Sequence, residues 1–183
     1  WSWSRGLGDV YKRQILDAAG GGKYFLNLAF ALVGKMRGGP AKAAILASGL
    51  TGMISGSSVA NTVTTGTFTI PIMKKTGLPP VKAGAVEVAA SVNGQIMPPI
   101  MGAAAFVMAE LLGISYLTVV THAFLPAVIS YIALFYISHL EALKLDIKGL
   151  PEEEIPPLGK TFLGGIHYLI PVSYTHLTLP TSR

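Results

Sequence analysis

The stretch TGMISGSSVANTV at residues 51–63 decides how the fold is interpreted, because it sets a polar cluster inside an apolar chain. Serine, threonine and asparagine side chains crowd this stretch, and Gly52 and Gly56 free its backbone to turn. Apolar and small residues flank it on both sides, within 43–73. The stretch therefore predicts a turn that is buried in an apolar protein, where its polar groups need hydrogen-bond or ligand partners.

The composition indicates a membrane protein. Charged residues make up only 13% of the chain, against about 25% in soluble domains. Residues 116–138, YLTVVTHAFLPAVISYIALFYIS, contain no Asp, Glu, Lys or Arg, and about 20 such residues suffice to cross the hydrocarbon of a bilayer. We therefore expect an all-α membrane protein in the lipid bilayer, with a transmembrane helix over 116–140. The absence of cysteine leaves the redox compartment open.

The two ends of the chain resemble translated adaptor DNA of the kind used in sequencing libraries. With suitable codons, the DNA that encodes DVYKRQ at 9–14 also encodes VSYTH at 172–176 when its opposite strand is read. We therefore exclude 1–14 and 172–183 from the fold and expect the protein proper over 15–171. The excluded ends carry both tryptophans, and the net charge of +5 falls to +2 without them. The basic charge is then no argument for a nucleic-acid partner.

Clusters of lysine and arginine bound the polar stretch on both sides, and such clusters mark cytoplasmic loops. Residues 43–73 lie between two of these clusters, so both ends of the segment should face the cytoplasm. Each arm, 43–55 and 58–73, is short for a full span, so we expect a re-entrant helical hairpin that turns at Ser55-Gly56-Ser57. The clusters are Lys35, Arg37 and Lys42; Lys74, Lys75 and Lys82; and Lys144, Lys148 and Lys160.

A second polar interruption lies in residues 81–112, which are predicted to form a transmembrane helix. The motif NGQIMPPIMG at 93–102 breaks this helix, because Pro98 and Pro99 remove two backbone donors and the flanking glycines loosen the chain. The remaining segments are an amphipathic helix on the cytoplasmic surface at 24–36, a cytoplasmic loop at 144–160 and the start of a further helix at 161–171. An ordinary packed helix is the alternative for the first of these.

A hairpin tip and a broken helix that face each other in a membrane form a plausible ion site. Broken helices expose backbone carbonyls to cations, and serine and asparagine side chains add neutral oxygens. We expect sodium to bind there, with a proton as the alternative coupling ion. Alternatively, the small residues only let helices pack closely. The candidate sodium ligands are Ser55, Gly56, Ser57, Ser58, Asn61, Asn93, Gly94 and Gln95.

Glu87 is the ionisable residue that lies well inside a predicted span. Ionisable groups within membranes are functional candidates, and this carboxyl group could carry a proton or bind a cation. It could equally be a structural partner of Lys82, five residues earlier in the sequence. We expect His122 and His139 to be packing or interfacial residues.

Two long motifs carry a resemblance to a transporter family. They are GGPAKAAILASGLTGMISGSSVANTVTTGTFTIPIMKKTG at 38–77 and AGAVEVAASVNGQIMPPIMGAAAF at 83–106. Both resemble the large membrane subunit of TRAP (tripartite ATP-independent periplasmic) transporters. Glu87 and the motif HLEALKL at 139–145 look most similar to the fused permeases of the TAXI branch. The resemblance covers nearly all of 15–171.

The resemblance implies a partial elevator-type transporter domain, about half of a fold that is built from inverted repeats. It implies uptake of organic acids that a periplasmic substrate-binding protein delivers, driven by an ion gradient, usually of sodium, with no other cofactor. It also implies a small membrane subunit, fused or separate, and a multi-pass location in the cytoplasmic membrane of a bacterium or archaeon. The positions of the residues in the two family motifs imply that sodium is bound by residues 55–58, Asn61 and residues 93–95.

Other functions stay open from the residues alone. A re-entrant segment also builds the filter of a channel, and a membrane scaffold would need no ion site. An intramembrane serine protease would pair Ser57 with His122, but several serines compete for the role of nucleophile. The motif AGGGK at 19–23 lacks the spacing of a phosphate-binding loop. We therefore expect that the protein is not an enzyme.

Overall fold

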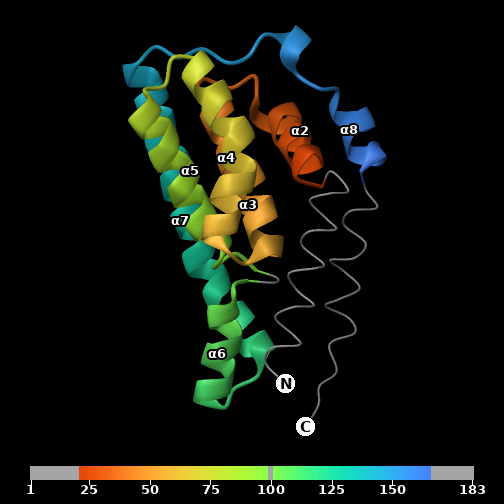
Figure 1. Cartoon of the computed structure of the whole chain (residues 1–183), viewed down its shortest axis with the longest axis vertical. Helices are drawn as coiled ribbons and strands as arrows, with labels where there is room; N and C mark the ends of the chain where they lie inside the picture. Colours follow the sequence, from red (N-terminus) through yellow and green to blue (C-terminus); the bar gives the residue numbers. More distant parts are fainter. Residues whose placement is uncertain (1–20, 99–100, 166–183) are drawn as a thin grey trace.

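The computed structural model of the chain describes residues 21–98 and 101–165 (Figure 1). Helices joined by turns and loops make up this part, which contains no strand, and this confirms the predicted all-α class for it. The ends interpreted as adaptor sequence, Pro99 and residues 166–171 lie outside the described residues. The helices are α2 (Gly21–Val33), α3 (Gly39–Ser55), α4 (Ser58–Lys75), α5 (Pro80–Gly94), α6 (Ala103–Leu112), α7 (Tyr116–Lys144) and α8 (Leu158–Gly164), with a short 3-10 helix at Glu152–Glu154.

Helices α3 and α4 form an antiparallel hairpin over the segment that the sequence marks as a hairpin (Figure 1). Helix α3 ends where Gly56 adopts a positive φ of 61° and donates its N–H to the carbonyl of Gly52 at 2.8 Å. Ser57 follows at once as the cap of α4, and its hydroxyl accepts from the N–H of Ala60 at 3.4 Å. A glycine that stops one helix and a serine that starts the next therefore reverse the chain at Gly56 and Ser57.

The charged loops gather at the end of the bundle opposite the hairpin tip. Helix α3 begins there, α4 and α7 end there, and α5 starts there (Figure 1). Positive residues at both ends of the hairpin thus share one end of the molecule, as insertion from one side of a membrane requires. Among the described residues, ion pairs at this end of the bundle join Lys35 with Glu152, Arg37 with Asp146 at 3.1 Å, Lys75 with Glu154 at 3.9 Å, and Lys82 with Glu141.

The hairpin is shorter than the long helix beside it. Helix α7 has 29 residues and is about 44 Å long, whereas the 17 residues of α3 give about 26 Å. The tip therefore stops about 18 Å short of the far end of α7. Helix α6 occupies the remaining length, where Ala105 packs against Val119 in the first half of α7 (Figure 1). The tip consequently lies inside the length of the bundle, while its depth in a membrane stays a prediction.

Helix α2 differs from the amphipathic helix that the sequence predicts at 24–36. It ends at Val33, because Gly34 begins a tight turn that leads into α3. Leu32 is 55% exposed, and Met36 lies beyond the helix and is 49% exposed, so neither belongs to the buried face of α2. The buried face instead contacts α3 and α8 and consists of Tyr24, Phe25, Leu26, Ala29 and Phe30. Tertiary packing, rather than helical period alone, selects this face.

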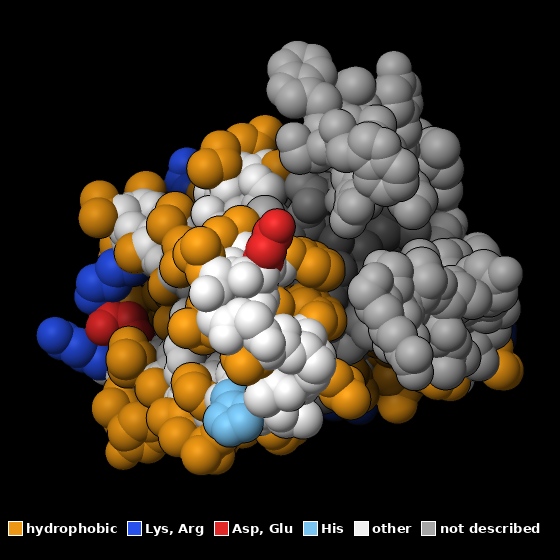
Figure 2. Space-filling model, turned by 90° about the horizontal axis from the view of Figure 1, so that it is seen from below, with side chains coloured by type: hydrophobic (Ala, Val, Ile, Leu, Met, Phe, Trp, Pro, Cys, Tyr) orange, Lys and Arg blue, Asp and Glu red, His pale blue; other side chains and the backbone are white. Residues whose placement is uncertain are grey.

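Helix α7 is long and apolar enough to cross a membrane. Its most apolar window has a mean hydropathy of 1.8, and only 17% of that window is buried. A core helix of a soluble protein would be mostly buried, so that explanation does not fit this helix. Figure 2 shows the end of the molecule that carries α6, where hydrophobic side chains cover much of the described surface. An apolar surface of this kind needs lipid or further protein against it.

Cysteine labelling in the full-length protein tests the one-sided hairpin. Arg37→Cys and Lys75→Cys flank it on exposed positions, and both should react with a membrane-impermeant maleimide added from the cytoplasmic side. Glu110→Cys, exposed near the end of α6, should react only from the opposite side. Labelling of the two flanking cysteines from opposite sides would show that residues 43–73 cross the membrane completely.

Candidate functional site at the hairpin tip

The hairpin tip and the break after α5 are in direct backbone contact. A β-carbon placed on Gly94 would lie 2.9 Å from the Cα atom of Gly52, so these two glycines allow the closest approach of α3 and α5. A β-carbon on Gly102 would lie 3.0 Å from the carbonyl oxygen of Gly56. The N–H of Gly102 donates to the carbonyl of Gln95 at 2.7 Å, which closes the loop of the break. The two polar interruptions of the sequence therefore meet at one place.

The predicted ligands divide into residues that shape the tip and residues that face its interior. The hydroxyl of Ser55 bonds the backbone of Ser57 at 3.4 Å, and that of Ser57 caps α4, so both stabilise the turn. Ser58, Asn93 and Gln95 are half-buried, whereas Gly94 is buried in the contact with α3. Asn61 is only 2% exposed and is the most buried of the predicted ligands that have a polar side chain.

The side chain of Asn61 leaves one oxygen without a partner. Its amide nitrogen donates to the carbonyl of Ser48 at 2.8 Å, to the hydroxyl of Ser48 at 2.8 Å and to that of Ser91 at 3.1 Å. A carbonyl only accepts, so this contact fixes which way the amide points. Within the part of the chain that the structure describes, the buried Oδ1 atom has no hydrogen-bond partner. Such an orphan costs free energy, which a bound cation would recover.

The same polar network continues to Glu87, which is fully buried and shares Ser48 and Ser91 with Asn61. Its Oε1 atom accepts from the hydroxyls of Ser48 at 3.0 Å and of Thr65, and from that of Ser91 at a longer 3.4 Å. Its Oε2 atom accepts from the hydroxyl of Thr69 at 2.6 Å. The carboxyl group therefore joins both arms of the hairpin to α5.

The sequence marks Glu87 as a candidate residue but none of the hydroxyls around it. The available signal was spacing: Asn61, Thr65 and Thr69 recur every four residues along one face of α4. The alternative that Glu87 is a structural partner of Lys82 is wrong. Lys82 forms its ion pair with Glu141 of α7 instead.

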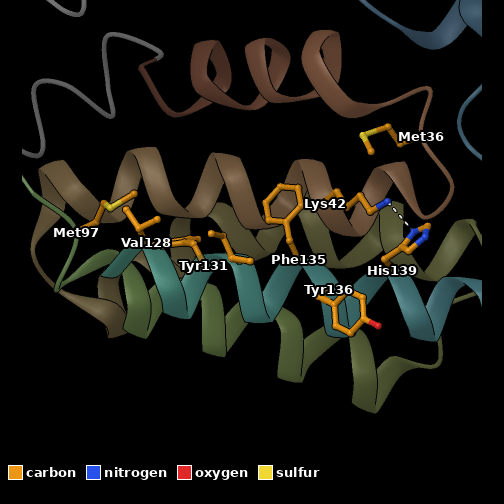
Figure 3. Close-up of a pocket in the computed structure, with 9 residues that line it drawn as sticks. Met36, Lys42, Met97, Val128, Tyr131, Phe135, Tyr136 and His139 are labelled. Carbon is orange, nitrogen blue, oxygen red and sulfur yellow. Dashed lines mark hydrogen bonds between the residues drawn. The ribbon is translucent and has the colours of Figure 1, made fainter. Parts of the chain in front are cut away.

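A groove between α3 and α7 is lined mainly by apolar side chains, including Met97 and Phe135 (Figure 3). Lys42 lies at one end, where its ammonium group donates to the carbonyl of Arg37 at 2.8 Å and contacts Nδ1 of His139 at 3.0 Å. An ammonium group only donates, so His139 accepts with a neutral ring nitrogen. His139 is thus part of a packed contact, as the sequence predicts.

These features are those of a helical protein in which a hairpin tip meets a helix break beside a helix that is long and apolar enough to span a membrane. The family comparison is specific: the chain belongs to the DctM component family of tripartite ATP-independent periplasmic transporters, whose family model matches residues 12–177. The family consists of transporters and not of enzymes, so the protease alternative falls away. The match extends into the adaptor-like segments at both ends, whose interpretation stays a prediction.

Individual relatives agree with the family assignment. The chain is 33% identical over 133 residues to the YgiK protein of Salmonella typhimurium, covering 73% of this chain and 30% of the relative. It is 29% identical over 134 residues to a Haemophilus influenzae protein provisionally named a TRAP transporter large permease protein, covering 73% and 31%. A Sinorhizobium fredii protein, y4mL, is 36% identical over 78 residues, covering 43% and 19%. The chain thus spans less than a third of the length of these relatives.

Substitution of Gly94 tests the contact between tip and break. We expect Gly94→Ala to force α3 and α5 apart and to lower the free energy of unfolding by about 1–3 kcal/mol, as overpacking does. Gly84→Ala is the matched control, because a β-carbon there meets nothing within 4 Å and alanine favours the helix by up to about 1 kcal/mol. Thermal unfolding in detergent measures both. Equal stability of the two variants would contradict the close approach.

Proposed function

We propose that the full-length protein is the large permease of a secondary transporter that couples uptake of organic acids to a sodium gradient. The observation that carries this proposal is the buried, unpartnered Oδ1 atom of Asn61 beside the junction of tip and break. The full assembly would include a periplasmic binding protein and a small membrane subunit, fused or separate, in the cytoplasmic membrane. Membership of the DctM family supports each of these partners.

The junction has the chemistry that a weakly held sodium ion needs. The side-chain oxygen of Asn61 is neutral, and helices α3 and α5 both end at the junction, where C-terminal carbonyls favour cations. A neutral site can bind a monovalent cation and also release it. Asn61 stands on α4 and is hydrogen-bonded to Ser48 of α3 and Ser91 of α5, so the occupancy of its oxygen would affect how the hairpin sits on α5.

The helix N-termini at the junction suit an organic acid, the second species that the proposed transporter carries. Helix α4 begins at Ser58 on the tip, and α6 begins at Ala103 directly after the glycine that contacts the tip. Helix N-termini attract anions, so the carboxylate of an organic acid is the class of substrate that fits this place. The second hairpin of the elevator-type fold would come from the part of the full-length protein beyond this chain. The TAXI branch is the proposed subgroup.

A channel and a scaffold are the rival functions, and transport measurements separate them from a symporter. The full-length protein would be reconstituted in liposomes with its binding protein, and uptake of organic acids measured under a sodium gradient. Uptake that requires both the gradient and the binding protein supports the proposal. Ion flux without the binding protein would indicate a channel, and no uptake of any organic acid tested would favour a scaffold.

Substitution of Asn61 tests the sodium site. We expect Asn61→Ala to raise the sodium concentration for half-maximal uptake roughly tenfold or more, as loss of a group that holds a metal does. Thr67→Ala is the matched control, because its exposed hydroxyl lies on the same helix and bonds only the carbonyl of Thr64 among the described residues. An unchanged sodium dependence in Asn61→Ala would show that Asn61 does not bind the coupling sodium ion.

A further inference from the structure

We infer that Glu87 is a proton-binding site of the permease, distinct from the sodium site at Asn61, and that Thr69 switches between its two protonation states. Its role in coupling rests on the proposed transport function, whereas proton binding itself does not. The inference starts from the position of the carboxyl group. Glu87 is 0% exposed and lies between three helices, and its hydrogen bonds reach both arms of the hairpin.

No positive group compensates a charge on Glu87 in the described ranges 21–98 and 101–165. On α3 the nearest basic residue, Lys42, bonds the carbonyl of Arg37 and the ring of His139. On α5, Lys82 is paired with Glu141 of α7. The other basic groups of these helices are Lys74 and Lys75 at the charged end of α4 and Lys144 at the same end of α7, and the hydroxyl of Tyr131 of α7 donates to the carbonyl of Ala90 at 3.1 Å. Burial of a carboxylate without an ion partner is costly, so binding of a proton is the way in which this site can lose its charge.

The spacing of the oxygens favours a proton over a metal ion. The hydroxyl of Thr69 lies 2.6 Å from Oε2, and that of Ser48 lies 3.0 Å from Oε1. The hydroxyls of Ser48 and Ser91 are themselves 2.9 Å apart. These are hydrogen-bond distances, so the oxygens contact one another directly. A metal ion would have to push them apart, whereas a proton fits between two of them.

Thr69 allows the site to be satisfied both with and without the proton. Its hydroxyl lies 2.6 Å from Oε2 of Glu87 and 3.0 Å from the backbone carbonyl of Thr65. In the ionised state the hydroxyl donates to Oε2. In the neutral state a proton from water forms the O–H bond on Oε2 and is donated to Thr69, whose own hydrogen turns to the carbonyl of Thr65. On release, the Oε2–H bond breaks and the proton returns to water.

Proton binding would change how the hairpin is held. Ionised Glu87 accepts charge-assisted hydrogen bonds from Ser48 on α3 and Thr69 on α4, and these are stronger than bonds to the neutral acid. The proton therefore weakens the attachment of both hairpin arms to α5, and its release strengthens that attachment. Thr69 is a positioning residue in this scheme, because it acts only through Glu87.

Infrared spectroscopy of the full-length protein at several pH values tests the proton site without transport. We expect a carbonyl band of a protonated carboxylic acid that disappears as pH rises and is absent from Glu87→Gln. Glutamine matches the neutral acid in shape and donates to Thr69 as the acid does, so this variant should fold. A band that is unchanged in Glu87→Gln, or no band that depends on pH, would overturn the inference.

Thr69→Val provides an independent test, because it keeps the shape of the side chain but removes the hydroxyl. Thr69 is the hydrogen-bond partner of Oε2, so its loss should shift the frequency of the carbonyl band relative to the wild type. Thr67→Val, exposed on the same helix, should leave the band unchanged. An unshifted band in Thr69→Val would contradict the proposal that Thr69 bonds Glu87 in both protonation states.

Transport then separates failure of this inference from failure of the proposed function. Uptake in the wild type should depend on pH, and Glu87→Gln should flatten that dependence. If the wild type shows no uptake that needs the binding protein, the proposed function fails, while the infrared result still decides the proton site. If uptake occurs with the same pH dependence in both proteins, Glu87 has no role in coupling.

Discussion

The contact between Gly52 and Gly94 is the constraint on which the rest of the site depends. Because neither residue has a β-carbon, α3 and α5 approach to backbone distance just before each of them ends. That approach brings the amide of Asn61 onto Ser48 and Ser91, and it places the loop of the break against Gly56. A larger residue at either glycine would separate the hairpin from the helix that completes its polar interior.

The polar interior solves a problem that every apolar bundle faces when it encloses hydrophilic groups. Hydroxyl side chains donate and accept, so they satisfy a buried carboxyl group without adding charge. Ser48 is shared, because it contacts both Asn61 and Glu87. The amide and the carboxyl group therefore lie in one continuous network, in which Asn61 Oδ1 is the unmatched acceptor among described residues. The network is satisfied around Glu87 and incomplete around Asn61, and this difference is the basis for proposing a proton site at one and a cation site at the other.

The sequence was informative where local chemistry decides structure. The hairpin turn at Gly56 and Ser57 and the break near Pro98 follow from the conformational preferences of glycine, serine and proline, which act over a few residues. The partners of Glu87 were not predictable, because they lie on three helices whose rotation depends on close packing. The same limitation applies to Lys82, which pairs with Glu141 across 59 positions of the chain rather than with a neighbour on its own helix.

The unequal lengths of the hairpin and α7 have an electrical consequence. The tip stands about 26 Å from the charged end of the bundle and about 18 Å from the other end of α7. With the hairpin inserted in the membrane as proposed, a cation that reaches the tip crosses part of the transmembrane voltage before any helix moves. Moving one charge through the whole of that voltage is worth about 2.3 kcal/mol per 100 mV. Affinity at the tip would then depend on membrane potential, and the step of ion binding would itself carry current.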